Sequence, residues 1–123
     1  MKIPDGYEAV MPYLIVKNAS AFIDFTKKVF NAELTFRILR DENLVRHAEI
    51  KIGGSPIMLA DCTDKFGPRE ATLMVYVENA DETYKKAIDE GAEIITELSN
   101  QKYGRTGGIT DPFGITWWIT SVI

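Results

Sequence analysis

The single histidine and a nearby carboxylate are the side chains best suited to acid–base chemistry in this 123-residue chain. His47 and Glu49 stand two residues apart in a run that alternates as a β-strand does, so both side chains point to the same face of the strand. A histidine titrates near neutral pH, and a neighbouring carboxylate can orient its ring. The pair therefore indicates either a general acid–base group or a purely structural hydrogen bond.

The chain contains one histidine and one cysteine, Cys62, and this count excludes several kinds of site. A disulfide within the chain is impossible, as are zinc fingers, Cys-x-x-Cys redox pairs and the His-Glu-x-x-His helix of metalloproteases. No Gly-x-Ser-x-Gly sequence is present, so nothing indicates a serine hydrolase. We expect no metal and no cofactor, and we expect Cys62 to stand outside the site.

The charge balance indicates which partners the chain could bind. Its 14 basic and 18 acidic residues give a formal net charge of −4, which disfavours nucleic acid and membrane surfaces and mildly favours a cationic small molecule. The N-terminus lacks the apolar run of a signal peptide, and no stretch has the length of a membrane span. We therefore expect a cytoplasmic protein whose partner is a small molecule.

Hydrophobic periodicity divides the chain into two halves with the same order of elements, a strand, a helix and three further strands. The first half predicts strands at 9–17, 33–40, 44–52 and 56–61, and a helix at 19–30 that Asn18 caps and Asn31 ends. The second half predicts strands at 71–78, 93–98, 105–110 and 115–122, and a helix between Asn79 and Gly91. Val16-Lys17-Asn18-Ala19 matches Val77-Glu78-Asn79-Ala80 at the same joint.

This repeat predicts one α+β domain over residues 1–123, made of two βαβββ modules at about 9–61 and 70–122 with a linker at 62–69. Each module contributes four strands and one helix, and the helices are expected on the outer face of the sheet.

Alternation along the strands assigns the side chains to two faces. The face expected beneath the helices is aliphatic and aromatic: Phe36, Ile38, Ala48, Ile50, Ile52, Leu73, Val75, Val77, Trp117 and Ile119. The opposite face is expected to carry Met11, Tyr13, Arg37, His47, Glu49, Leu59, Asp61, Thr72, Met74, Tyr76, Thr116 and Trp118. Apolar and aromatic groups among a few ionisable ones favour a small-molecule site, although a solvated sheet face is the alternative.

Six short stretches carry a resemblance to a known family: Pro12–Lys17, Ala21–Phe25, His47–Glu49, Met58–Asp61, Tyr76–Glu78 and Asp111–Gly114. Through them the chain resembles the vicinal oxygen chelate superfamily, the glyoxalase/bleomycin-resistance/dioxygenase group, and it is most similar to the PhnB-like branch. The resemblance covers nearly the whole length. It implies paired modules that form an eight-stranded curved mixed sheet, a cup with its helices outside, and assembly as a homodimer.

Metal-dependent members of this superfamily hold their metal with four His, Gln or Glu side chains on the inner faces of the strands. The resemblance carries these four positions over to Met11, Leu59, Thr72 and Trp118. A methionine thioether suits soft metals, and the other three side chains are not ligands of zinc, nickel or iron. Glyoxalase or dioxygenase chemistry, which runs through the metal, is therefore not expected.

The first hypothesis for the function is a metal-free binding module that resembles the drug-sequestering bleomycin-resistance proteins. In that case Tyr13, Tyr76 and Trp118 would stack on the ligand, while Glu49 and Asp61 would supply complementary charge.

The second hypothesis is an enzyme of altered chemistry. His47 would act as the general acid–base group, Glu49 would orient it, and Arg37 would hold an anionic substrate unless it is a simple surface charge. A metal site made of His47, Glu49 and Asp61 is a third alternative, which would need further ligands.

Overall fold

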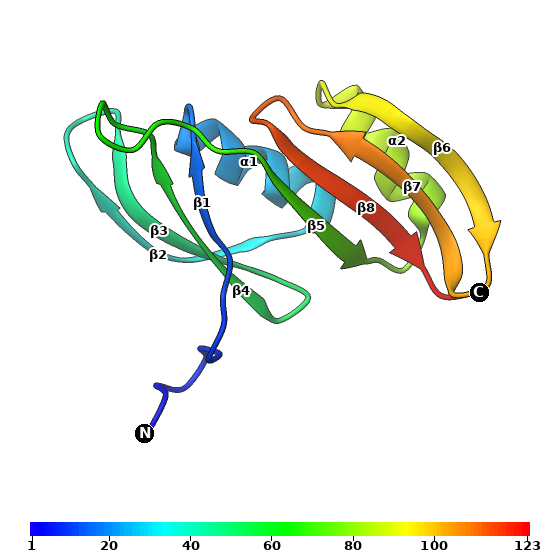
Figure 1. Cartoon of the computed structure of the whole chain (residues 1–123), viewed down its shortest axis with the longest axis horizontal. Coiled ribbons are helices and arrows are strands. Elements are labelled where there is room, and N and C mark those ends of the chain that lie inside the picture. Colours follow the sequence, from blue (N-terminus) through cyan, green and yellow to red (C-terminus); the bar gives the residue numbers. More distant parts are fainter. The chain divides into compact units, whose positions relative to one another are not determined.

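A computed structural model describes residues 1–123, which form two compact units (Figure 1). The first unit contains Met1–Lys27 and Asn31–Arg69, so the segment expected as a linker, 62–69, belongs to it. The second unit contains Lys28–Phe30 and Glu70–Ile123. Neither helix of the structure is long and apolar enough to cross a membrane.

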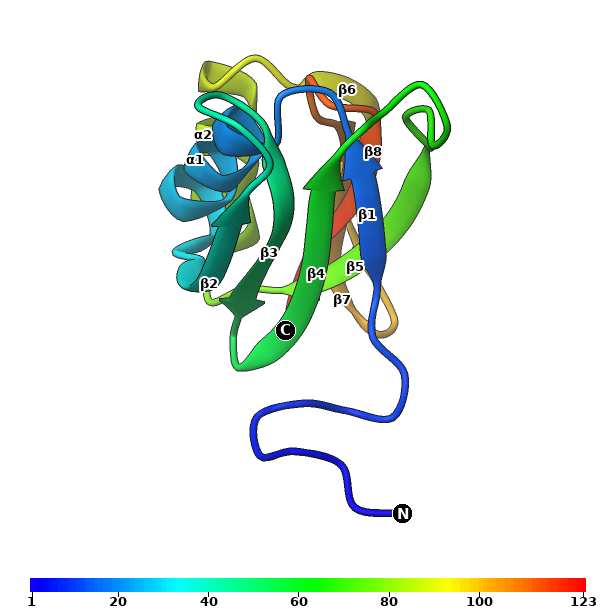
Figure 2. The same ribbon diagram turned by 90° about the vertical axis from the view of Figure 1, so that its left-hand side faces the viewer.

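The first unit contains one four-stranded mixed sheet (Figure 2). Its elements follow one another as β1 (Tyr13–Val16), α1 (Ala19–Phe30), β2 (Glu33–Leu39), β3 (Val45–Ile52) and β4 (Ser55–Asp61), and only the last three residues of α1 belong to the second unit. The strand order across the sheet is β1-β4-β3-β2, with β1 parallel to β4 and the other pairs antiparallel.

The second unit repeats this arrangement. Its elements are β5 (Ala71–Tyr76), α2 (Ala80–Asp89), β6 (Glu93–Gln101), β7 (Gly104–Thr110) and β8 (Ile115–Ser121), with the strand order β5-β8-β7-β6. The α+β class and the two βαβββ modules are thus confirmed. The eight strands form two four-stranded sheets rather than one continuous sheet, because β1 pairs only with β4 and β5 only with β8, which leaves β1 and β5 as edges.

Asparagines begin and end α1, as the sequence predicted. The Asn18 side chain accepts a hydrogen bond from the Ala21 N–H at 3.2 Å, and Asn31 ends the helix at φ 56°. Asparagine tolerates this left-handed conformation better than most residues. In α2 the side chain of Asn79 accepts from the Glu82 N–H at 3.1 Å, and Gly91 follows the helix at φ 102°.

The buried core of each unit consists of aliphatic and aromatic side chains. In the first unit Phe22 and Ile23 of α1 are buried, as are Ala48 and Ile50 on one face of β3. In the second unit α2 packs against β7, where Gly107 makes room for the ring of Tyr84. A Cβ atom at Gly107 would lie 2.9 Å from that ring, so a larger residue fits only if the Tyr84 ring or the neighbouring Leu98 moves.

The turn before β8 depends on one buried carboxylate. Asp111 accepts hydrogen bonds from the backbone N–H groups of Phe113 and Ile115 at 2.8 and 3.0 Å, and from the indole N–H of Trp117 at 2.8 Å. Burial raises the pKa of Asp111, and the three hydrogen bonds oppose that change without cancelling it. The resemblance motif Asp111–Gly114 therefore has a structural role in this chain.

Candidate functional site

One face of the first sheet carries the ionisable groups of the candidate site. We call it the open face; it lies opposite the face on which Ala48 and Ile50 are buried. Tyr13 of β1 lies beside Met58 of β4, and Met58 lies beside Glu49 of β3. Neighbouring positions in paired strands point to the same side, so these three side chains form one row across the open face.

Four side chains of the first unit form a continuous hydrogen-bond chain, in the order Tyr13, His47, Glu49 and Tyr7. The Tyr13 hydroxyl lies 2.9 Å from His47 Nδ1, and His47 Nε2 lies 2.7 Å from Glu49 Oε2. The Tyr7 hydroxyl donates to Glu49 Oε1 at 2.5 Å. When the His47 ring is neutral, the Tyr13 hydroxyl donates to Nδ1 and the Nε2–H group donates to the Glu49 carboxylate. Every polar side-chain atom of these four residues then has a hydrogen-bond partner.

The pKa values of Glu49 and Tyr7 are both shifted by their places in this hydrogen-bond chain. Burial raises the pKa of Glu49, but the hydrogen bonds from Tyr7 and His47 and the charge of His47 lower it by more, so the net direction is down. The bond to Glu49, then burial and the carboxylate charge, raise the pKa of Tyr7. Glu49 is therefore an ionised acceptor that orients the His47 ring.

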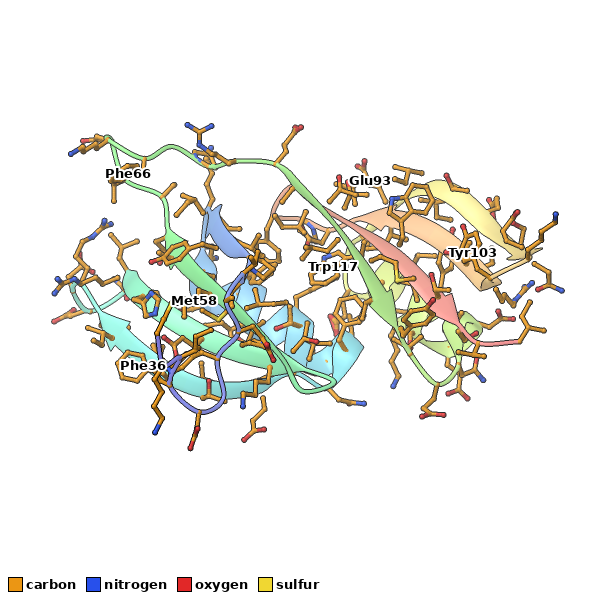
Figure 3. The ribbon with its side chains drawn as sticks, turned by 60° about the horizontal axis from the view of Figure 1, so that its bottom comes forward. Phe36, Met58, Phe66, Glu93, Tyr103 and Trp117 are labelled. Atoms are coloured by element: carbon orange, nitrogen blue, oxygen red, sulfur yellow. The ribbon has the colours of Figure 1, made fainter.

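A cavity of about 680 Å³ opens beside this chain, between the ends of the strands and the segment 62–69; we call it the first-unit cavity. Its lining is mainly apolar, with two arginines: Tyr13, Ile15, Leu39, Arg40, Val45, Arg46, Ala60, Asp61, Thr63 and Phe66. Phe66 lies at the tip of the segment after β4 (Figure 3) and is 59% exposed. Tyr13 belongs to both the cavity wall and the hydrogen-bond chain, so a ligand in the cavity would meet the end of that chain.

Arg37 does not lie on the open face, contrary to the expectation from alternation. The ladder between β2 and β3 shifts between Leu34, which pairs with Ile50, and Phe36, which pairs with Glu49. This bulge at Thr35 reverses the alternation as far as Ile38, because one extra residue turns the side chains that follow it to the other side. Phe36 and Ile38 consequently share the open face with His47, and the ring centroids of Phe36 and His47 are 6.1 Å apart.

Leu59 and Asp61 also lie away from the open face. Leu59 pairs with Leu14 and Ala48, all three of which are buried on the face opposite His47. The Asp61 carboxylate accepts from the Ala19 N–H at 2.8 Å and from the Val45 N–H at 2.6 Å, so it joins the start of α1 to the start of β3. Met58 and Ala60 take the places on the open face that were expected for Leu59 and Asp61.

The remaining expected ligand-binding residues belong to the second unit. Thr72, Met74 and Tyr76 of β5 share a face with Trp118 of β8, and Met74 lies directly beside Trp118. Gly108 lies on the other side of Trp118, and a Cβ atom there would be 2.8 Å from the indole ring. A hollow of about 330 Å³ over Met74 and Trp118 is completed by Tyr103, Thr106 and Thr120. Its lining contains no histidine, cysteine or carboxylate side chain.

Sequence reasoning missed several residues of the site. Tyr7 lies in a segment without periodicity before β1, and this segment borders a hollow that Phe36 of β2 and Met58 of β4 also line (Figure 3). Arg40 and Phe66 lie in turns, where alternation assigns no face. The Met58–Asp61 motif was the one available signal for Met58 and Ala60. Alternation along this motif was assigned one residue out of step, so Leu59 and Asp61 were placed on the open face in their stead.

The donor set does not fit the metal that the resemblance implies. No group of three or more His, Cys, Asp or Glu side chains lies close enough to hold a metal ion. Of the four carried-over positions, Leu59 is buried beneath the sheet, and Met11, Thr72 and Trp118 are none of the His, Gln or Glu side chains that hold zinc, nickel or iron in the metal-dependent members. His47 and Glu49 are bonded to each other, and the Asp61 carboxylate is bonded to backbone N–H groups.

Comparison with known proteins places the chain in a family. The model of the glyoxalase/bleomycin resistance protein/dioxygenase superfamily matches residues 8–119. The chain belongs to this superfamily. Among superfamily relatives, an uncharacterized protein of Mycobacterium bovis is 32% identical over 121 residues, an alignment that covers 89% of this chain and 80% of that protein.

Solved structures share the superfamily fold with this chain. A PhnB protein from Bacillus cereus has a TM-score of 0.76 at 22% identity, covering 94% of this chain and 100% of its own. TioX from Micromonospora sp. ML1 has a TM-score of 0.74 at 22% identity, with the same two coverages. At this identity the likeness concerns the fold alone.

Replacing Asp61 tests whether this carboxylate is structural. Asp61→Ala leaves two buried backbone N–H groups without an acceptor, so the free energy of unfolding should fall by about 1–3 kcal/mol for each, measured by urea unfolding. Asp61→Asn keeps one acceptor oxygen, so its free energy of unfolding should fall by less than that of Asp61→Ala. The matched control is Asp64→Ala, an exposed carboxylate three residues along. Equal unfolding midpoints for Asp61→Ala and Asp64→Ala would show that Asp61 does not hold the fold.

The lowered pKa of Glu49 predicts how stability depends on pH. Its folded-state pKa lies below the usual 4.5, so the ionised carboxylate stabilises the fold above that value and the stabilisation is lost as pH falls through the folded-state pKa. The difference in unfolding free energy between the wild type and Glu49→Gln should therefore shrink in acid. Tyr7→Phe removes one donor to Glu49 and should show the same trend with a smaller amplitude. A difference that grows as the pH falls would contradict the assignment.

Proposed function

We propose that this protein binds a small, largely apolar molecule in the first-unit cavity. The observation that carries the proposal is the cavity itself, whose volume of about 680 Å³ lies within the range of small-molecule sites. Its walls are mainly aliphatic and aromatic, and its polar or charged lining residues besides Tyr13 are Arg40, Arg46, Asp61 and Thr63. The superfamily assignment supports the same class of function.

Two exposed aromatic rings support this proposal. Tyr13 and Phe66 line the cavity yet are 51% and 59% exposed, so much of their apolar surface remains in contact with water. A flat apolar ligand would cover both rings and remove that surface from water, which is the main favourable term in binding of this kind. Glu49 and Asp61 are not part of this proposal as charged contacts, because both carboxylates already accept hydrogen bonds within the protein.

The proposal includes a cytoplasmic homodimer. The single Cys62 is a free thiol, as suits a reducing compartment. In the second unit Met74, Tyr76 and Tyr103 are each about half exposed, and a second copy of the chain would supply an apolar surface to cover them.

A second candidate function is general acid–base catalysis on the bound molecule. The observation that favours it is the hydrogen-bond chain, whose end residue, Tyr13, lines the cavity. A proton taken from the bound molecule by the Tyr13 oxygen would be matched by transfer of the Tyr13 proton to His47 Nδ1, while Glu49 stabilises the resulting imidazolium. Such a step uses only this chain's own residues.

A cavity-filling substitution tests the binding proposal. Ala60→Leu places three more carbon atoms in the first-unit cavity, so binding of the neutral fluorescent probe N-phenyl-1-naphthylamine should be lost. Ala71→Leu is the matched control, since Ala71 borders a different hollow in the second unit. Phe66→Ala, at an exposed position, should weaken probe binding by about 2- to 10-fold through loss of one aromatic contact. Unchanged binding in both Ala60→Leu and Phe66→Ala would overturn the proposal.

Catalysis is separated from binding by a substitution within the hydrogen-bond chain. For a substrate found by screening, His47→Ala should lower kcat by about 100-fold or more while the dissociation constant stays within a few-fold of the wild-type value. Tyr7→Phe, which leaves His47 bonded to both neighbours, should retain most of kcat. Full turnover by His47→Ala would contradict the catalytic role and leave the binding role in place.

A further inference from the structure

We infer that the ligand of the first-unit cavity carries an anionic group, a carboxylate, sulfonate or phosphonate, which Arg40 and Arg46 bind at the rim. This inference rests on the proposed binding function and names the chemical class of its ligand. It reverses the expectation from the net charge of −4, which favoured a cationic molecule.

Both arginines line the same cavity and neither has an ion-pair partner within the chain. Arg40 directly follows β2, and Arg46 is the second residue of β3, so they flank one turn. That turn is ordered by its own bonds: the Arg40 N–H donates to the Leu44 carbonyl at 2.7 Å, and the Asp41 carboxylate accepts from the backbone N–H groups of Asn43 and Leu44. The backbone that carries the two guanidinium groups is therefore held in place before any ligand arrives.

The one carboxylate that lines the cavity forms no ion pair with either arginine. Asp61 also borders the cavity, but its two oxygens accept the Ala19 and Val45 N–H groups and its side chain is buried. By contrast, Arg105 in the second unit forms an ion pair with Asp81. An unpaired guanidinium presents several N–H donors in a planar fork that matches a carboxylate or a related oxyanion.

The shape of the cavity fixes the rest of the ligand. The two arginines lie at the turn, whereas Ile15, Ala60 and Phe66 form the apolar part of the lining. A molecule with an aromatic or aliphatic body and one anionic group would place its body against the apolar lining and its anionic group against the two arginines. A neutral molecule would fill the same space and leave both arginines in water, and a cation would be repelled by them.

A matched pair of probes tests the charge requirement. The anionic probe 8-anilinonaphthalene-1-sulfonate has the skeleton of N-phenyl-1-naphthylamine with one added sulfonate. We expect the anionic probe to bind the cavity more tightly, taking the Ala60→Leu protein as the background for sites elsewhere on the surface. Arg40→Gln and Arg46→Gln should each lower the affinity for the anionic probe by about 2- to 5-fold, as for exposed ion pairs. The affinity for the neutral probe should stay unchanged. Added salt should reduce the preference.

The control variant is Arg37→Gln, which removes an arginine of β2 whose neighbour in β3 is Ala48, on the face away from His47. This substitution should leave the affinities for both probes unchanged. Equal affinities of the two probes, or an equal loss in Arg37→Gln and Arg40→Gln, would overturn the inference while cavity binding of the neutral probe stands. If neither probe distinguishes the wild type from Ala60→Leu, the proposed function fails, and the inference fails with it.

Discussion

The Asp61 carboxylate is the interaction on which the first unit depends. Its two oxygens accept backbone N–H groups from the first residue of α1 and the first residue of β3, and both bonds are buried. Three elements that are separate in the chain are thereby joined at one end of the sheet. The same bonds occupy both oxygens of the carboxylate at the edge of the first-unit cavity, and neither Arg40 nor Arg46 forms an ion pair with it.

A second carboxylate organises the open face in a different way. Glu49 receives hydrogen bonds from His47 and Tyr7, so its ionised form is stabilised and the imidazole ring is held in one orientation. Tyr13 continues the chain to the cavity wall. The two carboxylates therefore have different roles: Asp61 fixes the backbone around the cavity, and Glu49 fixes the orientation of the His47 ring.

The sheet register decides which side chains reach this site. One extra residue at Thr35 turns Phe36 and Ile38 toward His47 and turns Arg37 away, and a one-residue difference in the register of β4 replaces Leu59 and Asp61 by Met58 and Ala60. A sheet has a side-chain period of two, so any shift by one residue exchanges the faces completely. In the second unit, where β5 and β8 run without a shift, the assignment of Thr72, Met74, Tyr76 and Trp118 to one face agrees with the register.

The amino-acid sequence by itself determined the elements and their repeat, because helix caps such as Asn18 and Asn31 and the periodicity of apolar residues are local properties. It also placed His47 beside Glu49, since two positions in one strand need no distant information. Only the tertiary structure decided the rest of the site. Tyr7 reaches Glu49 across 42 positions, Asp61 turns to the backbone rather than to a ligand, and Arg40 and Arg46 meet Phe66 around one cavity. These outcomes depend on strand pairing, bulges and turns, which bring together residues that no local pattern connects.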